Sequence, residues 1–235
     1  MAQLIYREWF VKFRFPGHQK VKLVESPLGM MPEGWEVKKV GEVCSLVKRG
    51  ISPRYSDESK SVVINQKCIR NGRVDLSPSR RHTNAVPKDK MVRWGDVLVN
   101  STGVGTLGRL AQVLRQYDDT TVDTHVTIVR PDTIERHLFG LQMMGLESYF
   151  ESQAKGATGQ TELGRASIVD TPLLIPIPRL QKDFEGLVSP VRSLAVALED
   201  KNTVLRQTRD LLLPKLISGQ LDVSELDIDI GEAAA

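Results

Sequence analysis

A long heptad pattern toward the C-terminal end constrains the fold of this chain more than any other feature. Ten positions follow one another in alternating steps of four and three residues, and eight of them are apolar: Leu180, Phe184, Leu187, Val191, Leu194, Leu198, Lys201, Leu205, Thr208 and Leu212. A seam sustained over more than four repeats predicts one helix about 50 Å long, at about 1.5 Å per residue. A small domain cannot cover the whole stripe. We therefore expect the helix to pack lengthwise against another long helix, in this chain or in a partner.

The middle of the chain has a different pattern. Short apolar runs at residues 61–64, 97–99 and 125–129 lie between clusters of Gly, Pro, Asn and Asp, which is typical of short strands with long connections. Recurring apolar residues within 135–153 predict a helical interval. These features predict the α+β class, with a small mixed α/β domain followed by a long helix that forms a coiled coil.

The two ends of the chain complete a division into four parts. Leu4, Ile5, Trp9 and Phe10, followed by Pro16-Gly17, indicate the end of an amphipathic helix that runs into a linker. Five acidic residues and no basic residue follow Leu221, which indicates a flexible acidic tail. The expected parts are a helix end and linker at 1–31, a strand-rich domain at 32–178, the long helix at 179–220 and the tail at 221–235.

The composition is that of a soluble globular protein. The chain has 235 residues, of which 40% are hydrophobic, so it can bury a core without disulfide or metal staples. Cys44 and Cys68 are isolated and have no His pair at ligand spacing, which argues against a metal site and fits a reducing compartment. No uncharged apolar stretch has the length of a signal or membrane segment, so we expect a cytoplasmic protein.

Charge is distributed unevenly along the sequence. Residues 1–220 hold 32 Lys and Arg against 24 Asp and Glu, so the body of the protein is basic. Within residues 48–81 the bias is stronger, since nine basic residues accompany three acidic ones. A polyanion is therefore a candidate partner for this segment.

A glycine motif offers an alternative chemistry. Gly103-Val-Gly105-Thr-Leu-Gly108 follows an expected strand, and Asp123 lies twenty residues beyond its first glycine, as in a dinucleotide-binding fingerprint. The acidic residue of that fold ends the second strand, whereas Asp123 precedes the expected strand at 125–129. The spacing therefore favours a turn between two strands, and an enzyme that binds a nucleotide through this turn remains the alternative.

No catalytic constellation is recognisable. The sequence has no paired carboxylates of a nuclease, no Asn-Pro-Pro-aromatic loop of an adenine methyltransferase and no nucleophile motif beside a His. Two polar glycine-rich stretches, at 95–103 and 155–161, instead combine small hydrogen-bonding side chains with Gly, which suits close approach to a phosphate backbone or to base edges.

Six short motifs occur in the order found in one protein family. They are Met31-Pro-Glu-Gly-Trp35, Gly50-Ile-Ser-Pro53, Gly95-Asp-Val-Leu-Val99 with Leu107-Gly108-Arg109, Gly156-Ala-Thr-Gly-Gln160, Pro176-Ile-Pro178, and Leu211-Leu-Leu-Pro-Lys-Leu-Ile-Ser-Gly219. In this order the chain resembles specificity subunits of type I restriction-modification systems over essentially its whole length. Members of that family have two target-recognition domains and two conserved helical regions, and this chain has one of each. It therefore resembles the C-terminal half of a specificity subunit.

The resemblance implies a DNA reader that catalyses nothing and binds no cofactor. Residues 32–178 would read one half-site of double-stranded DNA, and the long helix would act as spacer and docking surface for methyltransferase (modification) subunits. Those partners would bring S-adenosylmethionine, and restriction subunits would bring ATP and Mg²⁺. A homodimer formed through the long helices would restore two recognition domains. A coiled-coil interaction protein that does not bind DNA remains a further alternative.

The residues expected to act fall into two groups. The candidate DNA contacts are Lys48, Arg49, Ser52, Arg54, Tyr55, Lys67, Arg70, Asn100, Ser101, Thr102, Thr106, Arg109, Thr158, Gln160 and Arg165. The candidate dimerisation residues are Leu180, Phe184, Leu187, Val191, Leu194, Leu198, Leu205 and Leu212.

Overall fold

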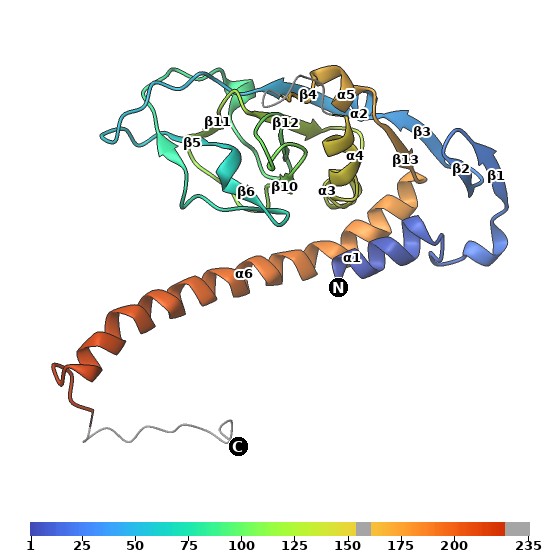
Figure 1. Cartoon of the computed structure of the whole chain (residues 1–235). Coiled ribbons are helices and arrows are strands. Elements are labelled where there is room, and N and C mark those ends of the chain that lie inside the picture. The colour runs from blue at the N-terminus through green and yellow to red at the C-terminus, as the bar shows by residue number, and fades with distance from the viewer. Residues whose placement is uncertain (154–160, 224–235) are drawn as a thin grey trace. The chain divides into compact units, whose positions relative to one another are not determined.

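The structure, a computed structural model, describes residues 1–153 and 161–223. The chain separates into two compact units, Met1–Arg192 (unit 1) and Ser193–Ala235 (unit 2). The strand-rich architecture with a long C-terminal helix confirms the predicted α+β class (Figure 1). None of the helices in the described ranges is long and apolar enough to span a membrane.

A four-stranded antiparallel sheet forms the centre of unit 1. Its strand order is β10 (Leu110–Gln112), β9 (Val97–Asn100), β12 (Val126–Pro131) and β4 (Cys44–Arg49). Successive side chains of a strand point to opposite faces, so Val97 and Val99 join one apolar cluster while Leu98 and Ile128 join another. Both faces of the sheet are therefore covered by apolar clusters. This explains why the runs at 97–99 and 125–129 are largely apolar.

A second, smaller sheet has the strand order β11 (Thr120–Val122), β5 (Val62–Ile64) and β8 (Arg80–Arg81). β11 pairs in parallel with β5, and β5 pairs antiparallel with β8. The two-stranded pairs are β1 (Leu23–Ser26) with β2 (Gly29–Pro32), β3 (Glu36–Lys39) with β13 (Pro172–Ile175), and β6 (Ile69–Arg70) with β7 (Arg73–Val74). The helices are α1 (Ala2–Tyr6), α2 (Val40–Val43), α3 (Arg136–Met144), α4 (Glu147–Ser152), α5 (Arg165–Val169) and α6 (Pro178–Ile217).

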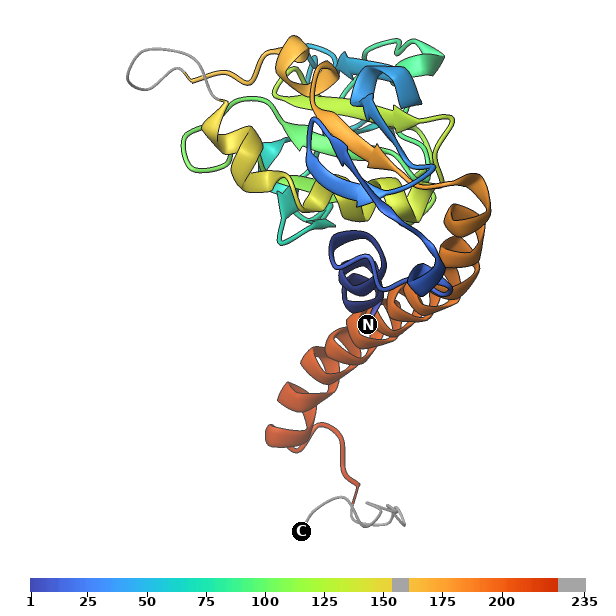
Figure 2. The ribbon, with the colours of Figure 1, turned by 90° about the vertical axis from the view of Figure 1, so that its right-hand side faces the viewer.

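The N-terminal segment differs from the expected helix end and linker. α1 continues into a π-helical turn at Arg7–Val11, and residues 23–32 form the β1–β2 hairpin instead of a linker. Trp9 and Phe10 are buried against Phe184, with ring centroids 5.8 and 4.8 Å apart. Figures 1 and 2 both show α1 beside the first turns of α6. Aromatic burial thus joins the expected parts 1–31 and 179–192 to the strand-rich domain in one unit.

Helix α6 spans Pro178–Ile217, close to the predicted extent. Proline suits the first turn of a helix because that position needs no backbone donor, and Gly219 with φ of +72° follows the end. Residues 224–235 of the expected acidic tail lie outside the described range.

The heptad seam does not lie on a single exposed face. Leu180 and Phe184 are buried inside unit 1, which corrects their assignment to a dimer interface. The buried stripe then continues at Val188, whereas Leu187 is 51% exposed. In unit 2 the remaining leucines of the seam are exposed: Leu194, Leu198, Leu205 and Leu212.

Candidate nucleic-acid interface

The ends of three strands meet at one edge of the smaller sheet. Because β11 and β5 run in parallel with Val122 opposite Ile64, the residues after both strands emerge at the same edge. Asn65 and the short 3-10 helix η3 (Gln66–Cys68) follow β5, and Asp123 follows β11. Arg80 of β8 lies opposite Val63 at the same place.

A close backbone approach brings a fourth segment to this edge. Ile51 forms a bridge with Asp123, and the N–H of Ile51 donates to the carbonyl of Val122 over 2.9 Å. A Cβ atom on Gly50 would stand 1.8 Å from the Val122 carbonyl oxygen, so only glycine fits there. Tyr55 then bridges to His82, directly after β8.

These segments enclose a polar hollow of about 250 Å³, here called the polar pocket. Its lining residues are Tyr55, Asn65, Gln66, Lys67, Pro78, Arg80, Asp123 and His125. Asn65 fixes two walls, since its Nδ2 donates to the Pro78 carbonyl at 2.7 Å and its Oδ1 accepts from the Lys67 N–H at 2.8 Å. The pocket therefore combines aromatic, amide and cationic groups on braced loops.

Positive charge at the pocket mouth is available to a ligand. The guanidinium carbon of Arg80 lies 3.4 Å from the centroid of the Tyr55 ring, a cation–π arrangement. Lys67 is exposed on η3. Within residues 1–153 and 161–223, neither the Arg80 guanidinium nor the Lys67 ammonium has a recorded hydrogen bond or ion pair with a protein acceptor.

Asp123 and His125 also line the pocket. Burial raises the pKa of the Asp123 carboxyl, although the backbone N–H of His125, which donates to it over 2.9 Å, acts in the opposite direction. The Nδ1 of His125 lies 2.6 Å from the Thr102 hydroxyl, which orients the imidazole ring. Both contacts hold the β11–β12 connection in place.

The predicted DNA contacts separate into several environments. Tyr55 and Lys67 line the polar pocket, and Ser52, Arg54 and Arg70 are exposed on the loops and strand that lead to it. Thr102, Thr106 and Arg109 are half-buried around the glycine turn. Thr158 and Gln160 lie outside the described residues.

Three of the predicted cationic contacts are engaged within the protein. Lys48 pairs with Asp89 at 2.9 Å, and Arg49 pairs with Glu162 at 2.6 Å and also donates to the Leu163 carbonyl. The Nε of Arg165 donates to the Val47 carbonyl at 2.7 Å. The contacts of Arg49 and Arg165 tie the 161–165 segment to β4.

Asn100 and Ser101 are not available to DNA and are corrected here to structural roles. Both are fully buried. The Asn100 amide donates to the carbonyls of Gln66 and Thr106, and the Ser101 hydroxyl lies 2.6 Å from that of Thr127. A strand-end position was visible in the sequence, but the packing of the neighbouring loops over that end was not.

The glycine motif is a turn between antiparallel strands. It joins β9 to β10, and Gly103, Gly105 and Gly108 all have positive φ. A dinucleotide fingerprint needs a helix after the turn, whose N-terminus receives the pyrophosphate. Because a strand follows here, the alternative of a nucleotide-binding enzyme loses its geometric support.

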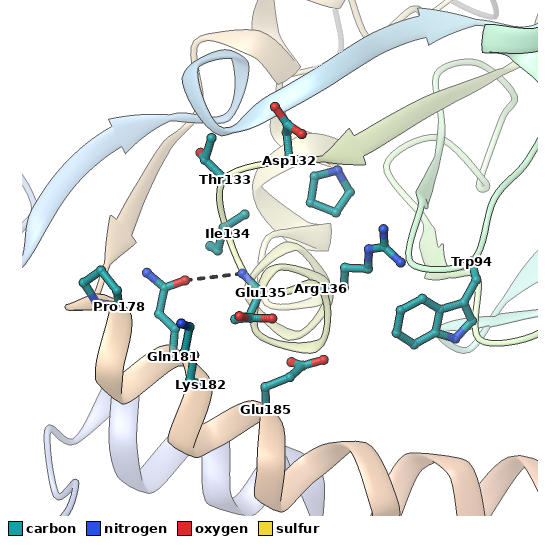
Figure 3. Close-up of a pocket in the computed structure, with 11 residues that line it drawn as sticks. Trp94, Asp132, Thr133, Ile134, Glu135, Arg136, Pro178, Gln181, Lys182 and Glu185 are labelled. Carbon is teal, nitrogen blue, oxygen red and sulfur yellow. Dashed lines mark hydrogen bonds between the residues drawn. The ribbon is translucent and has the colours of Figure 1, made fainter.

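A larger hollow of about 530 Å³ lies where α6 begins (Figure 3). Gln181 accepts from the Glu135 N–H at 3.3 Å, and Glu185 accepts from the His137 N–H at 3.2 Å and contacts its Nδ1 at 2.6 Å. Side chains of α6 thus cap the first turn of α3. The carboxylates of Asp132, Glu135 and Glu185 line this hollow, which makes it a poor match for a polyanion.

Three residues that line the pocket, Gln66, Arg80 and His125, were not among the predicted contacts. Arg80 belongs to the basic run at 48–81, so charge offered a signal, but nothing in the sequence indicates that it meets Tyr55. Gln66 and His125 sit just beyond strand ends, where polar residues are also common in ordinary turns.

In sequence and in fold, the chain is similar to known proteins of one class. No family model matches the chain. A type I restriction enzyme MjaIX specificity subunit from Methanocaldococcus jannaschii is 23% identical over 231 residues, which cover 96% of this chain and 53% of that protein.

Solved structures show the same fold. An HsdS subunit from Thermoanaerobacter tengcongensis matches with a TM-score of 0.53 and 19% identity, covering 94% of this chain and 50% of that one. A chain from a structure of type I R-M complex assembly and conformational transition also scores 0.53, with 19% identity and coverage of 91% and 51%. An S subunit from M. genitalium scores 0.52 with 17% identity, covering 79% and 46%. By sequence and by fold, this chain is thus similar to type I restriction-modification specificity subunits, and it spans about half the length of the relatives it matches.

Proposed function

We propose that this chain is the DNA-reading part of a type I specificity subunit. Unit 1 binds one half-site of a duplex, and the chain docks methyltransferase and restriction subunits while catalysing nothing itself. S-adenosylmethionine, ATP and Mg²⁺ belong to those partners in this proposal. The observation that carries it is the polar pocket, whose free cations lie on a fold shared with specificity subunits.

Exposed cations around the pocket suit a phosphate backbone. Arg54, Lys67 and Arg70 lie on loops and short strands beside it, and Arg80 lies at its mouth. Cations that neutralise phosphates release condensed counterions, so binding should weaken steeply as salt rises. Polar side chains in the pocket then supply contacts to base edges.

Selection from a random pool tests the proposal. The full chain is mixed with duplexes that carry a randomised 30-base-pair segment, and bound molecules are recovered and sequenced over several rounds. We expect one motif to be enriched. Binding without any enriched motif, or no binding at low salt, contradicts the proposal. The exposed seam would then favour the alternative, a coiled-coil interaction protein that does not read DNA.

A matched pair of variants localises the interface. Arg54→Ala combined with Arg70→Ala should weaken binding and lower the salt slope by about 2, at about 1 per lost phosphate contact. Arg179→Ala removes a cation that is 90% exposed at the start of α6 and should leave both quantities unchanged. Equal effects of the two changes would place the interface elsewhere.

We also propose that the exposed seam of unit 2 pairs with a second copy of this chain. Two copies match the length of one relative, because the chain spans about half of each. The N-terminal part of the seam has one net negative charge, from Glu199, Asp200 and Lys201. The C-terminal part has a net positive charge, from Arg206, Arg209 and Lys215 with Asp210, which pairs with Arg209 at 2.6 Å. Antiparallel pairing brings opposite charges together along the two helices. Such a dimer would read a symmetric target.

Light scattering after size exclusion tests the dimer. We expect a dimer at about 50 µM and a monomer for Leu205→Asp, because a buried carboxylate without a partner breaks an apolar seam. Leu213→Asp is the matched control, since Leu213 is 49% exposed and lies off the seam. A wild-type monomer at that concentration contradicts the pairing.

A further inference from the structure

The strand β8 directs its two arginines differently. Successive side chains of a strand point to opposite faces, and only Arg80 lines the polar pocket. The Nη1 of Arg81 donates instead to the Ser59 carbonyl over 3.0 Å. Arg80 therefore lies at the pocket while Arg81 makes a contact within the protein. Because the two residues are adjacent and carry the same charge, Arg81 is a matched control for Arg80.

Stacking on Tyr55 prepares Arg80 for a directional contact. The guanidinium lies over the ring at 3.4 Å, so its face is covered while its N–H groups at the edge remain available. Within the described parts of the chain, these N–H groups have no recorded protein acceptor. A side chain held in this way loses less conformational entropy when it binds, which favours a paired contact to two acceptors.

Gln66 presents an acceptor without a donor. Its Oε1 is buried and has no hydrogen-bond partner within the described residues. Asn100 fixes the backbone of Gln66 through a 3.0 Å hydrogen bond to its carbonyl, and the Nε2 end of the side chain lies against Gly103, 3.0 Å from where a Cβ would stand. Because this oxygen is shielded from solvent, a duplex does not reach it in this conformation, and the base contact at the pocket rests on Arg80.

A G·C pair supplies the complementary groups. In the major groove guanine offers the acceptors O6 and N7, which a guanidinium can bind together, and the paired cytosine offers an N4 amino donor. An A·T pair offers no such adjacent pair of acceptors on one base. The donor edge of Arg80 therefore matches the guanine of a G·C pair.

We infer that Arg80 is a specificity-determining residue that reads a guanine of the half-site, with Tyr55 positioning the guanidinium. This inference rests on the proposed function and names the base pair recognised at the pocket.

The test compares base preferences of full-length variants after the random-duplex selection. The wild-type motif should contain a G·C position at which any other pair binds about 10-fold or more weakly. Arg80→Ala should lose that preference while the other positions of the motif persist. Arg81→Ala should keep the complete motif, and Tyr55→Leu should keep the motif with lower affinity. Urea unfolding of each variant confirms that the fold is retained.

The possible failures are distinguishable. If wild type enriches a motif and Arg80→Ala keeps every preference, the inference is wrong and the proposed function stands. A uniform loss of affinity with unchanged preferences makes Arg80 a phosphate contact, which also overturns the inference. A wild-type chain that enriches no motif overturns the proposed function and the inference with it.

Discussion

Arg130 and Asp96 form an ion pair inside unit 1 that braces the central sheet. The Nε and one Nη of Arg130 each reach an Asp96 oxygen at 2.8 Å, and the Asp96 side chain is 1% exposed. The same guanidinium donates to the carbonyls of Asp89 and Met91. One arginine thus ties the segment before β9 to β12, and breaking the pair leaves a buried charge without compensation.

Asp96→Ala should therefore lower the free energy of unfolding by about 3–5 kcal/mol. Lys48→Ala removes one partner of the exposed Lys48–Asp89 pair and should cost about 1 kcal/mol or less. Urea unfolding followed by tryptophan fluorescence at pH 7 measures both. Equal costs for the two variants would show that burial does not govern the Arg130 pair.

Asp123 adds a pH dependence with a definite sign. Burial raises the pKa of its carboxyl in the folded protein, so the charged form is disfavoured there. Below the pKa of about 4 that this carboxyl has in the unfolded chain, the group is protonated in both states and the free energy of unfolding has its full value. As pH rises through the higher pKa of the folded protein, the free energy of unfolding falls.

Asp123→Asn removes the pH-dependent loss of stability, because the amide does not ionise, and it keeps an oxygen that accepts from the His125 N–H. Relative to the variant, the wild-type protein should be less stable at pH 7 than at pH 3, as measured by urea unfolding at both values. Parallel stability profiles would contradict a raised pKa at this position.

At the scale of elements, α6 changes its role along its length. Its first turns bury Leu180, Phe184 and Val188 in unit 1, while Leu187 is exposed. The N-terminal aromatics Trp9 and Phe10 cover that stripe. The heptad pattern predicted the helix, but the contacts of the π-helical turn that follows α1 decide which face is buried at its start.

Phe184→Ala should cost about 3–5 kcal/mol, because it opens a cavity between α1 and α6. It should also speed proteolysis near the N-terminus, since Trp9 and Phe10 lose their support. Leu187→Ala, three residues away and exposed, should change stability by about 0.5 kcal/mol or less. Similar effects of both substitutions would mean that the heptad seam, and not the observed stripe, is the packed face.

At the scale of the whole molecule, the proposed dimer links two DNA-reading units. Joining two binding modules raises overall affinity because the second contact becomes intramolecular. The exposed leucines of unit 2 would then control DNA affinity without touching DNA.

Leu198→Asp combined with Leu205→Asp should thus weaken binding to the selected symmetric duplex by about 100-fold or more. Binding to a duplex with a single half-site should stay unchanged, as should the unfolding of unit 1. Fluorescence anisotropy with the two duplexes measures the difference. An equal loss on both duplexes would indicate damage to unit 1 rather than loss of pairing.

The sequence by itself determined the long helix, three of the strands, the fold class and the basic character of the 48–81 segment. The heptad steps and the apolar runs at 61–64, 97–99 and 125–129 predicted a long helix and strands, and the structure contains both. Such patterns report on each residue's neighbours in the chain, so they are visible without a tertiary structure.

Only the tertiary structure decided which polar residues could act together. Asn100 was predicted to contact DNA, but its side chain is buried. Arg80 was noted only as one of the basic residues at 48–81, but its guanidinium lies over the Tyr55 ring. The pairing of β5 with both β8 and β11 assembles the polar pocket from segments that are distant in sequence. Strand pairing and burial depend on contacts across the chain, and local patterns carry no record of those contacts.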